Sequence, residues 1–209
     1  MAANMKAVKL RMKSIQSTMQ ITKAMELVAS SKLRKAKERA DASRPYFHTL
    51  ENTLEQIAAG NTDLSSVYTK KSKNEKWCYV VIAGDRGLAG GYNSNLFKEM
   101  ESQTAGKDYC VLPIGKKAVE YYKRRGIELV TEEFAEAGDI SVSDCFEIAA
   151  LLCRAFKTGE FGHAALGYTN FVSMLSQKPD VSSMLPLEDL SGEEKDMKQI
   201  HSLILYEPD

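Results

Sequence analysis

Apolar side chains recur at helical spacing along the first 57 residues of the chain. Between Met5 and Ile57 there is no glycine and only one proline, Pro45. Because glycine and proline are the usual helix breakers, the pattern predicts one long helix over residues 1–58. At 1.5 Å per residue such a helix would span roughly 80 Å, which is typical of half of a coiled coil or of a helical hairpin. We expect Pro45 to kink or interrupt it and Ser43 to cap a restart.

Two nearly opposite sides of this helix are apolar. The first stripe has heptad-like spacing and consists of Met5, Val8, Met12, Ile15 and Met19; the second consists of Leu10, Ile21, Met25 and Val28. A surface helix needs only one apolar face, so two faces predict that the helix is covered from two directions. Because so long a rod projects beyond a small domain, we expect at least one cover to come from outside the rest of this chain's fold. A helical bundle within a homo-oligomer is an equally good interpretation.

A different pattern follows the helix. Residues 59–76 are polar and rich in turn-forming residues, and we interpret them as a linker. Over residues 77–209 short apolar runs alternate with helical patterns. The runs at 77–83, 108–115, 127–134 and 163–172 predict strands, and the segments 93–103, 116–125 and 142–159 predict helices. The tail, 198–209, is expected to add one more strand. Strand and helix in alternation predict an α/β domain with a parallel sheet.

The composition is that of an ordinary soluble protein, with 44% hydrophobic and 27% charged residues. No stretch approaches the roughly 18 consecutive apolar residues of a membrane-spanning helix, and the N-terminus lacks the apolar core of a signal peptide. We therefore interpret the protein as cytosolic or peripheral. The four cysteines form no C-x-x-C pair, so buried thiols are favoured over a zinc site or disulfides.

Charge is distributed unevenly. Residues 1–44 contain 11 Lys/Arg and 3 Asp/Glu, a net charge of +8, whereas residues 45–209 contain 17 and 25, a net charge of −8. Beyond Val28, basic residues lie all round the helix: Lys32, Arg34, Lys35, Lys37 and Arg39. A solvated surface explains such a run, and so does a shaft that passes acidic neighbours in turn. Attraction to nucleic-acid phosphates is a third interpretation, but the absence of interleaved aromatics argues against base stacking.

The segment VIAGDRGLAGGYNSNLF, residues 81–97, has the order of a nucleotide-binding loop, with a strand, glycines and then a helix. A P-loop needs Lys and Ser/Thr after its last glycine, and here Tyr92 and Asn93 follow. The dinucleotide fingerprint is missing too, because Gly84, Gly87 and Gly90 are each three residues apart. We favour a structural turn in which Asp85 and Arg86 form a local ion pair or a turn-stabilising contact. A nucleotide-binding α/β enzyme that uses the Gly84–Gly91 loop is the alternative function.

Other catalytic patterns are weaker. His48, His163 and His201 lie far apart in the sequence and outside any metal-binding motif, so satisfied surface or core histidines are the better interpretation. No G-x-S-x-G elbow is present.

A family resemblance rests on stretches of sequence that are longer than these short motifs. SIQSTMQITKAMELVASSKLRKAKERADASRPY, residues 14–46, closely resembles the N-terminal helix of the gamma subunit of rotary F-type ATP synthase. DRGLAGGYN (85–93), SQKPDVSSMLPLE (176–188) and LYEPD (205–209) follow in the family's order. The resemblance implies a non-catalytic central rotor stalk with a Rossmann-like α/β domain over residues 77–209. It implies no cofactor, no metal, no catalytic residue and no nucleic-acid partner.

The resemblance also implies partners and contact residues. A ring of three alpha and three beta subunits would surround the shaft, with the epsilon subunit and the membrane c ring at its foot. Lys23, Met25 and Glu26 would lie near an acidic beta-subunit segment. The residues toward the foot would be Lys32, Arg34, Lys35, Tyr206 and Glu207. The location implied is peripheral, at the cytoplasmic face of a bacterial plasma membrane. The coupling ion is not encoded here.

One departure from the family pattern follows Asp209, where the family continues into a C-terminal helix that completes the coiled coil. We therefore expect this chain to transmit torque incompletely. We also expect the isolated chain to self-associate, or to lose helicity over residues 1–40.

Overall fold

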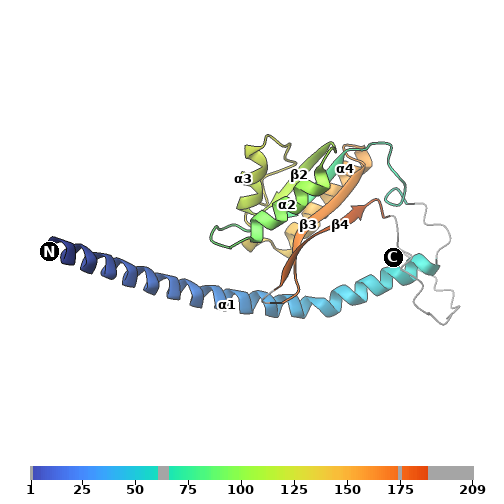
Figure 1. Cartoon of the computed structure of the whole chain (residues 1–209). Coiled ribbons are helices and arrows are strands. Elements are labelled where there is room, and N and C mark those ends of the chain that lie inside the picture. The colour runs from blue at the N-terminus through green and yellow to red at the C-terminus, as the bar shows by residue number, and fades with distance from the viewer. Residues whose placement is uncertain (1, 61–65, 174–175, 188–209) are drawn as a thin grey trace. The chain divides into compact units, whose positions relative to one another are not determined.

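The computed structural model describes residues 2–60, 66–173 and 176–187. The chain divides into two compact units, one containing the first helix and the other containing every later element (Figure 1). Each unit is described below by itself.

The first unit is built on α1, Ala2–Gly60, a single helix that continues through Pro45 (Figure 1). The expected interruption at Pro45 was therefore wrong, and Ser43 caps no restart: its hydroxyl donates to the carbonyl of Ala40 at 2.9 Å, inside the helix. Proline cannot donate to the carbonyl four residues earlier, that of Asp41. Because α1 is exposed here, water can satisfy that carbonyl, and the helix continues without the bond.

The second unit contains a four-stranded sheet in the order β2-β1-β3-β4. Its strands are β1, Trp77–Ile82; β2, Tyr109–Ile114; β3, His163–Phe171; and β4, Gln177–Leu185. β1 pairs in parallel with both β2 and β3, and β4 runs antiparallel to β3. β1 is buried along most of its length, as expected of a central strand of a parallel sheet covered on both faces.

Helices cover the two faces of this sheet. α2 (Tyr92–Thr104) and α3 (Lys116–Arg124) pack on the face that carries Tyr79 and Val81. α4 (Val142–Thr158) packs on the other face, against Cys78 and Val80. A short 3₁₀ turn, Ala137–Asp139, precedes α4. The predicted α/β fold with flanking helices is therefore confirmed, with three parallel strands and one antiparallel edge strand.

α4 begins with a capping box. The Ser141 hydroxyl accepts from the backbone N–H of Asp144 at 3.2 Å, and the Asp144 carboxylate accepts from the backbone N–H of Ser141 at 2.7 Å. These two bonds satisfy donors that the first helical turn leaves without partners, and they fix where α4 starts.

The strand predicted over residues 127–134 does not form. Only Leu129 bridges to the sheet, opposite Val111 of β2. Backbone hydrogen bonds hold the segment to the domain. The carbonyl of Glu128 accepts from the N–H of Val111, and the carbonyl of Phe134 accepts from the N–H of Gly115. Ion pairs also tie it to the domain, at Lys76–Glu128 (2.7 Å), Lys123–Glu132 (2.6 Å) and Lys116–Glu136 (2.6 Å). The backbone bonds to β2 and the residue after it are therefore too few and too widely spaced for a strand.

β4 was not predicted, because its sequence QKPDVSSML is polar and contains Pro179. Proline is tolerated in an edge strand, where its missing N–H breaks no ladder bond. The strand expected at 198–209 lies outside the described residues. The cysteines are free thiols, and Cys78 and Cys110 are buried as expected, whereas Cys145 is exposed.

Candidate interaction surface

The first apolar stripe of α1 is open to solvent along its whole length. Met5, Val8, Met12, Ile15 and Met19 are all exposed, Met19 to 66%. Side chains of this kind lose about 25 cal/mol for each Å² of apolar surface that stays in water. A row of five along one side of a helix is therefore a surface made for contact.

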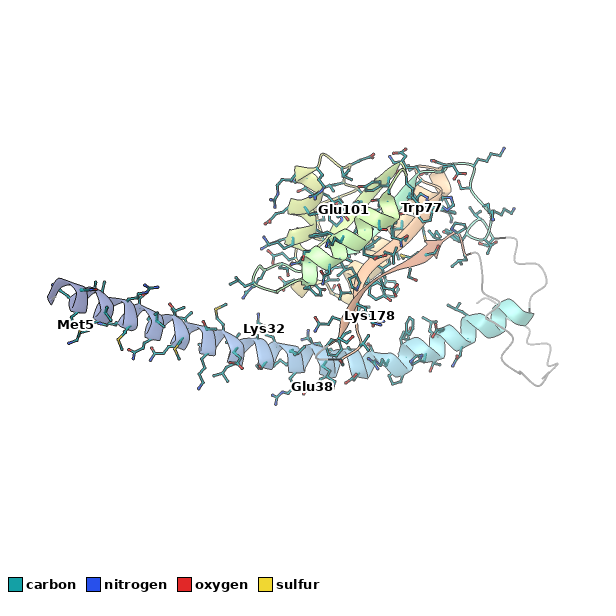
Figure 2. All side chains as sticks on the ribbon, viewed as in Figure 1. Met5, Lys32, Glu38, Trp77, Glu101 and Lys178 are labelled. Atoms are coloured by element: carbon teal, nitrogen blue, oxygen red, sulfur yellow. The ribbon has the colours of Figure 1, made fainter. Side chains whose placement is uncertain are left out.

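The second stripe is equally open. Leu10, Ile21, Met25 and Val28 are exposed, with Met25 at 52%. Successive helical residues are about 100° apart, which puts this stripe nearly opposite the first. From Asn4 to Leu54 every side chain of α1 is exposed, and Figure 2 draws these side chains along the helix. The expectation of a helix that is apolar on two sides agrees with these exposures, and the expected cover from outside the chain stays a prediction.

Hydroxyl groups between the stripes bond to the helix itself. Thr18 donates to the Ser14 carbonyl at 3.0 Å, and Thr22 donates to the Thr18 carbonyl at 2.9 Å. Each hydroxyl donor therefore has a partner before any neighbour arrives, so a neighbour can cover this side of α1 without leaving that donor unpaired.

The residues predicted to contact a beta subunit lie together on α1 but do not share one side. Lys23, Met25 and Glu26 are all exposed. Met25 belongs to the second stripe, and Glu26 is turned about 100° from it around the axis. Lys23 and Glu26 are three residues apart and therefore neighbours on the first-stripe side. A single partner segment that touches all three must reach across more than one face.

The basic segment is also exposed. Lys32, Arg34 and Lys35 all face solvent, as do Lys37 and Arg39. Arg34 pairs with Glu38 one turn later at 3.7 Å, with both side chains mostly in water. Such an exposed pair contributes little, about 0.5 kcal/mol or less, so it leaves Arg34 available to a partner. Tyr206 and Glu207 lie outside the described residues.

A further apolar row was missed in the sequence. Tyr46, Phe47, Leu50 and Leu54 are exposed beyond Pro45, Phe47 to 60%. Their spacing of three and four residues is a helical signal that could have been found, but the break expected at Pro45 hid it. With Pro45 inside a continuous helix, these residues extend the contact surface of α1 toward its C-terminal end.

The glycine loop has a structural role. The Asp85 carboxylate accepts hydrogen bonds from the backbone N–H groups of Ala137 (2.8 Å), Gly138 (2.9 Å) and Lys116 (3.2 Å). Burial acts to raise the pKa of Asp85, but these three donors outweigh it and hold the pKa below its ordinary value. Asp85 thus makes the turn-stabilising contact that was expected.

Those contacts also weigh against a phosphate at this loop. The carboxylate of Asp85 is held in the loop by these bonds, and its negative charge repels a phosphate there. The loop tip carries Leu88, 94% exposed and with a φ of 62°, so an apolar side chain points outward there. Gly84 N–H donates to the side chain of Asn93 at 2.8 Å, which fastens the loop to α2.

The histidines serve local contacts. His48 lies 3.5 Å from Glu51 on α1, and His163 stacks on Trp77 with ring centroids 4.6 Å apart. His201 lies outside the described residues. Among the described residues no group of His, Cys, Asp and Glu side chains is placed to hold a metal ion. Nor is any helix in that part of the chain long and apolar enough to cross a bilayer.

Comparison with known proteins places these features in one family. A family model described as ATP synthase matches residues 4–209. The ATP synthase gamma chain of Ruminococcus albus is 43% identical, over 99% of this chain and 72% of the relative. That of Heliobacterium modesticaldum is 35% identical, over 98% of this chain and 72% of the relative. The sodium ion specific gamma chain of Acetobacterium woodii is 36% identical, over 90% of this chain and 62% of the relative.

A solved structure agrees in fold. A chain in the central stalk and c-ring structure of Tetrahymena thermophila mitochondrial ATP synthase superposes with a TM-score of 0.55 at 24% identity, covering 79% of this chain and 72% of that chain. The sequence match spans nearly the whole chain, from the two-sided helix through the glycine loop to the tail. The chain therefore belongs to the ATP synthase gamma-chain family.

Proposed function

We propose that the chain works as the central rotor-stalk subunit of ATP synthase and couples rotation of the membrane c ring to conformational changes at the catalytic beta subunits. The observation that carries the proposal is the exposure of both apolar stripes of α1. A helix with this surface gains most of its stability from neighbours on two sides. Such neighbours are what a ring of subunits around a shaft supplies.

The proposed mechanism is mechanical. The ring of three alpha and three beta subunits covers the stripes of α1, and the shaft presents different side chains to each beta subunit as it turns. Met25 lies on one side of the helix and Lys23 and Glu26 lie together on another, so an acidic beta-subunit segment meets an apolar side chain or a charged pair according to the angle. Differential contact of this kind is what allows rotation to bias the affinity of each site.

Toward the foot of the shaft, we assign contacts to the exposed basic residues Lys32, Arg34 and Lys35. Encircling positive charge attracts acidic neighbours with little angular preference, which suits a part that turns against the epsilon subunit and the c ring. Tyr206 and Glu207, expected at the same foot, remain a prediction. The location follows from these partners: peripheral, at the cytoplasmic face of the bacterial plasma membrane.

Reconstitution tests this function. The tagged chain, co-expressed with the alpha, beta and epsilon subunits of its own source, should purify with them in one complex. Replacing one residue of each stripe, Ile15→Asp with Met25→Asp, should release the alpha and beta subunits, because two charges would be buried without partners. As a control, Lys6→Asp with Lys9→Asp also places two acids on α1, but outside the stripes. A chain that purifies alone, or whose stripe variant assembles as well as the control, would falsify the proposal.

A further inference from the structure

The sheet domain neutralises many of its own basic side chains. Its described ion pairs involve Lys76, Lys116, Lys117, Lys123, Arg124 and Arg125, each within 4.0 Å of a carboxylate. One corner of the domain differs. Five basic side chains there form no ion pair with any described residue, and we call them the basic corner: Lys70, Lys71, Lys73, Arg154 and Lys157.

Contacts between two segments far apart in sequence create this corner. The ring of Tyr68 stacks on Phe156 of α4 with centroids 6.3 Å apart, and the Asn74 side-chain amide donates to the Gly159 carbonyl at 2.8 Å. The ammonium group of Lys157 lies 5.2 Å from the centroid of the Tyr68 ring. The segment from Tyr68 to Asn74 is therefore fastened at both ends to the C-terminal part of α4, beside which it runs in Figure 1. The segment that carries the three lysines therefore lies against the end of α4 that carries Arg154 and Lys157.

Two carboxylates next to this corner, Glu75 and Glu160, form no ion pair with a described lysine or arginine. Glu75 lies 4.0 Å from the ring of His163, and Glu160 accepts a hydrogen bond from the hydroxyl of Thr158 at 3.0 Å. Glu128 pairs with Lys76. Five cations close together on one surface repel one another, and their positive potential attracts an anionic partner.

The chain supplies such a partner at the same place. The backbone N–H of Leu187 donates to the carbonyl of Tyr68 at 2.8 Å, so the chain passes directly beside the basic corner there. The next nine residues, EDLSGEEKD, contain five acidic residues and one lysine. They lie outside the described residues. We propose that this acidic segment, residues 188–196, binds the basic corner of its own chain.

The length and the negative charge of residues 188–196 both favour this segment over a separate protein as the partner of the basic corner. Nine residues span at most about 30 Å when extended, which covers a corner defined by one helix end and one short segment. Because Leu187 tethers the segment, its carboxylates act at an effective concentration in the millimolar range without any second molecule. Both sets of charges are exposed, so the contact weakens as added salt shortens the roughly 8 Å screening length of physiological solution.

Zero-length cross-linking tests the contact. A water-soluble carbodiimide joins a lysine amine to a carboxylate only where the two touch, and mass spectrometry identifies the joined peptides. In the purified chain, Lys70, Lys71 and Lys73 should link to acidic residues of 188–196, and the links should decline in high salt. A mixture of isotopically light and heavy chains distinguishes links within one chain from links between chains. Links only between chains, or none to this segment, would overturn the proposal.

Charge reversal adds a second test. The variant Lys70→Glu, Lys71→Glu, Lys73→Glu should lose those links, and adding Glu188→Lys, Asp189→Lys, Glu193→Lys to the same chain should restore them with the charges exchanged. Arg86→Glu, Lys98→Glu, Lys178→Glu is the matched control, since these basic residues form no described ion pair and lie elsewhere on the domain. Loss of the links in the control, or no recovery in the exchanged variant, would contradict a specific contact. The proposal does not depend on the rotor function, and the purified chain alone suffices to test it.

Discussion

Asp85 and Lys116 come from neighbouring strand ends and meet where α3 begins, the aspartate carboxylate accepting the backbone N–H of Lys116 at 3.2 Å. The same carboxylate also takes the N–H groups of Ala137 and Gly138. We expect Asp85→Ala to destabilise the sheet domain by about 2–3 kcal/mol, since three donors lose a charged acceptor at once. Chemical denaturation followed by the fluorescence of Trp77 measures this. Asp85→Asn keeps an acceptor oxygen and should cost less; equal stability of the alanine variant and the parent would show that the contact is dispensable.

Acid should weaken the domain through the same group. The pKa of Asp85 is lowered in the folded state, because its three backbone donors outweigh the effect of burial. The pKa of Asp144 is also lowered, by the backbone N–H and the hydroxyl of Ser141. Each carboxylate therefore stabilises the fold above its unfolded pKa of about 4, and this contribution disappears as pH falls through the folded pKa. Unfolding curves between neutral pH and pH 3 should show the loss, and Asp85→Asn should reduce it.

Nucleotides should not bind at the glycine loop. The Asp85 carboxylate is held in the loop by backbone donors of other segments, and its negative charge repels a phosphate. Titration calorimetry with ATP and with NAD should give no heat of binding. Affinity tighter than about 100 μM, roughly −5.5 kcal/mol, that disappears in a loop variant would instead support a nucleotide site.

The isolated chain should self-associate through α1. Its stripes are exposed, and a helix without neighbours is marginally stable in water. Light scattering should show oligomers that dissociate in the variant Met12→Gln, Ile15→Gln, Met19→Gln. A strict monomer whose α1 amides are fully protected from hydrogen exchange would contradict both the self-association and its alternative, loss of helicity over residues 1–40.

Pro45 should limit the stability of α1. Its replacement by alanine restores a donor for the Asp41 carbonyl and removes a steric clash, an effect of up to about 3 kcal/mol on local helix stability. We expect slower amide exchange over residues 41–49 in Pro45→Ala. Ala42→Gly, one turn away, should act in the opposite direction by about 1 kcal/mol. Faster exchange in Pro45→Ala would mean that the proline stabilises α1.

The elements that were predicted correctly share strong apolar periodicity. Strand β1 and helix α4 carry continuous or helical apolar patterns, and their positions agree with the prediction within about two residues. Residues 127–134 carry enough apolar residues to resemble a strand, yet Glu128 and Glu132 are drawn to lysines that come from other elements. β4 was missed for the converse reason, since an edge strand needs little apolar character. Local pattern does not contain the tertiary partners that decide such cases.

The interaction surface was more predictable than its partners. Helical spacing placed Met19 and Met25 on opposite sides of α1, and both are exposed. Nothing in that spacing identifies what covers them, and the family assignment came from longer strings of sequence. Asp85 could be placed in the turn from its position alone, but Ala137 and Gly138, some fifty residues later, could not be recognised as its donors.

Every side chain of α1 from Asn4 to Leu54 is exposed to water, so none of them belongs to a buried core. In a globular domain a damaging substitution in the core is detected because it destabilises the domain itself. On α1 the same substitution can leave the purified chain as soluble and as helical as before, with the fault appearing only where other subunits close around it. Selection on the exposed side chains of α1 therefore acts through the assembly, and a denaturation curve that follows Trp77 of the sheet domain will not register it.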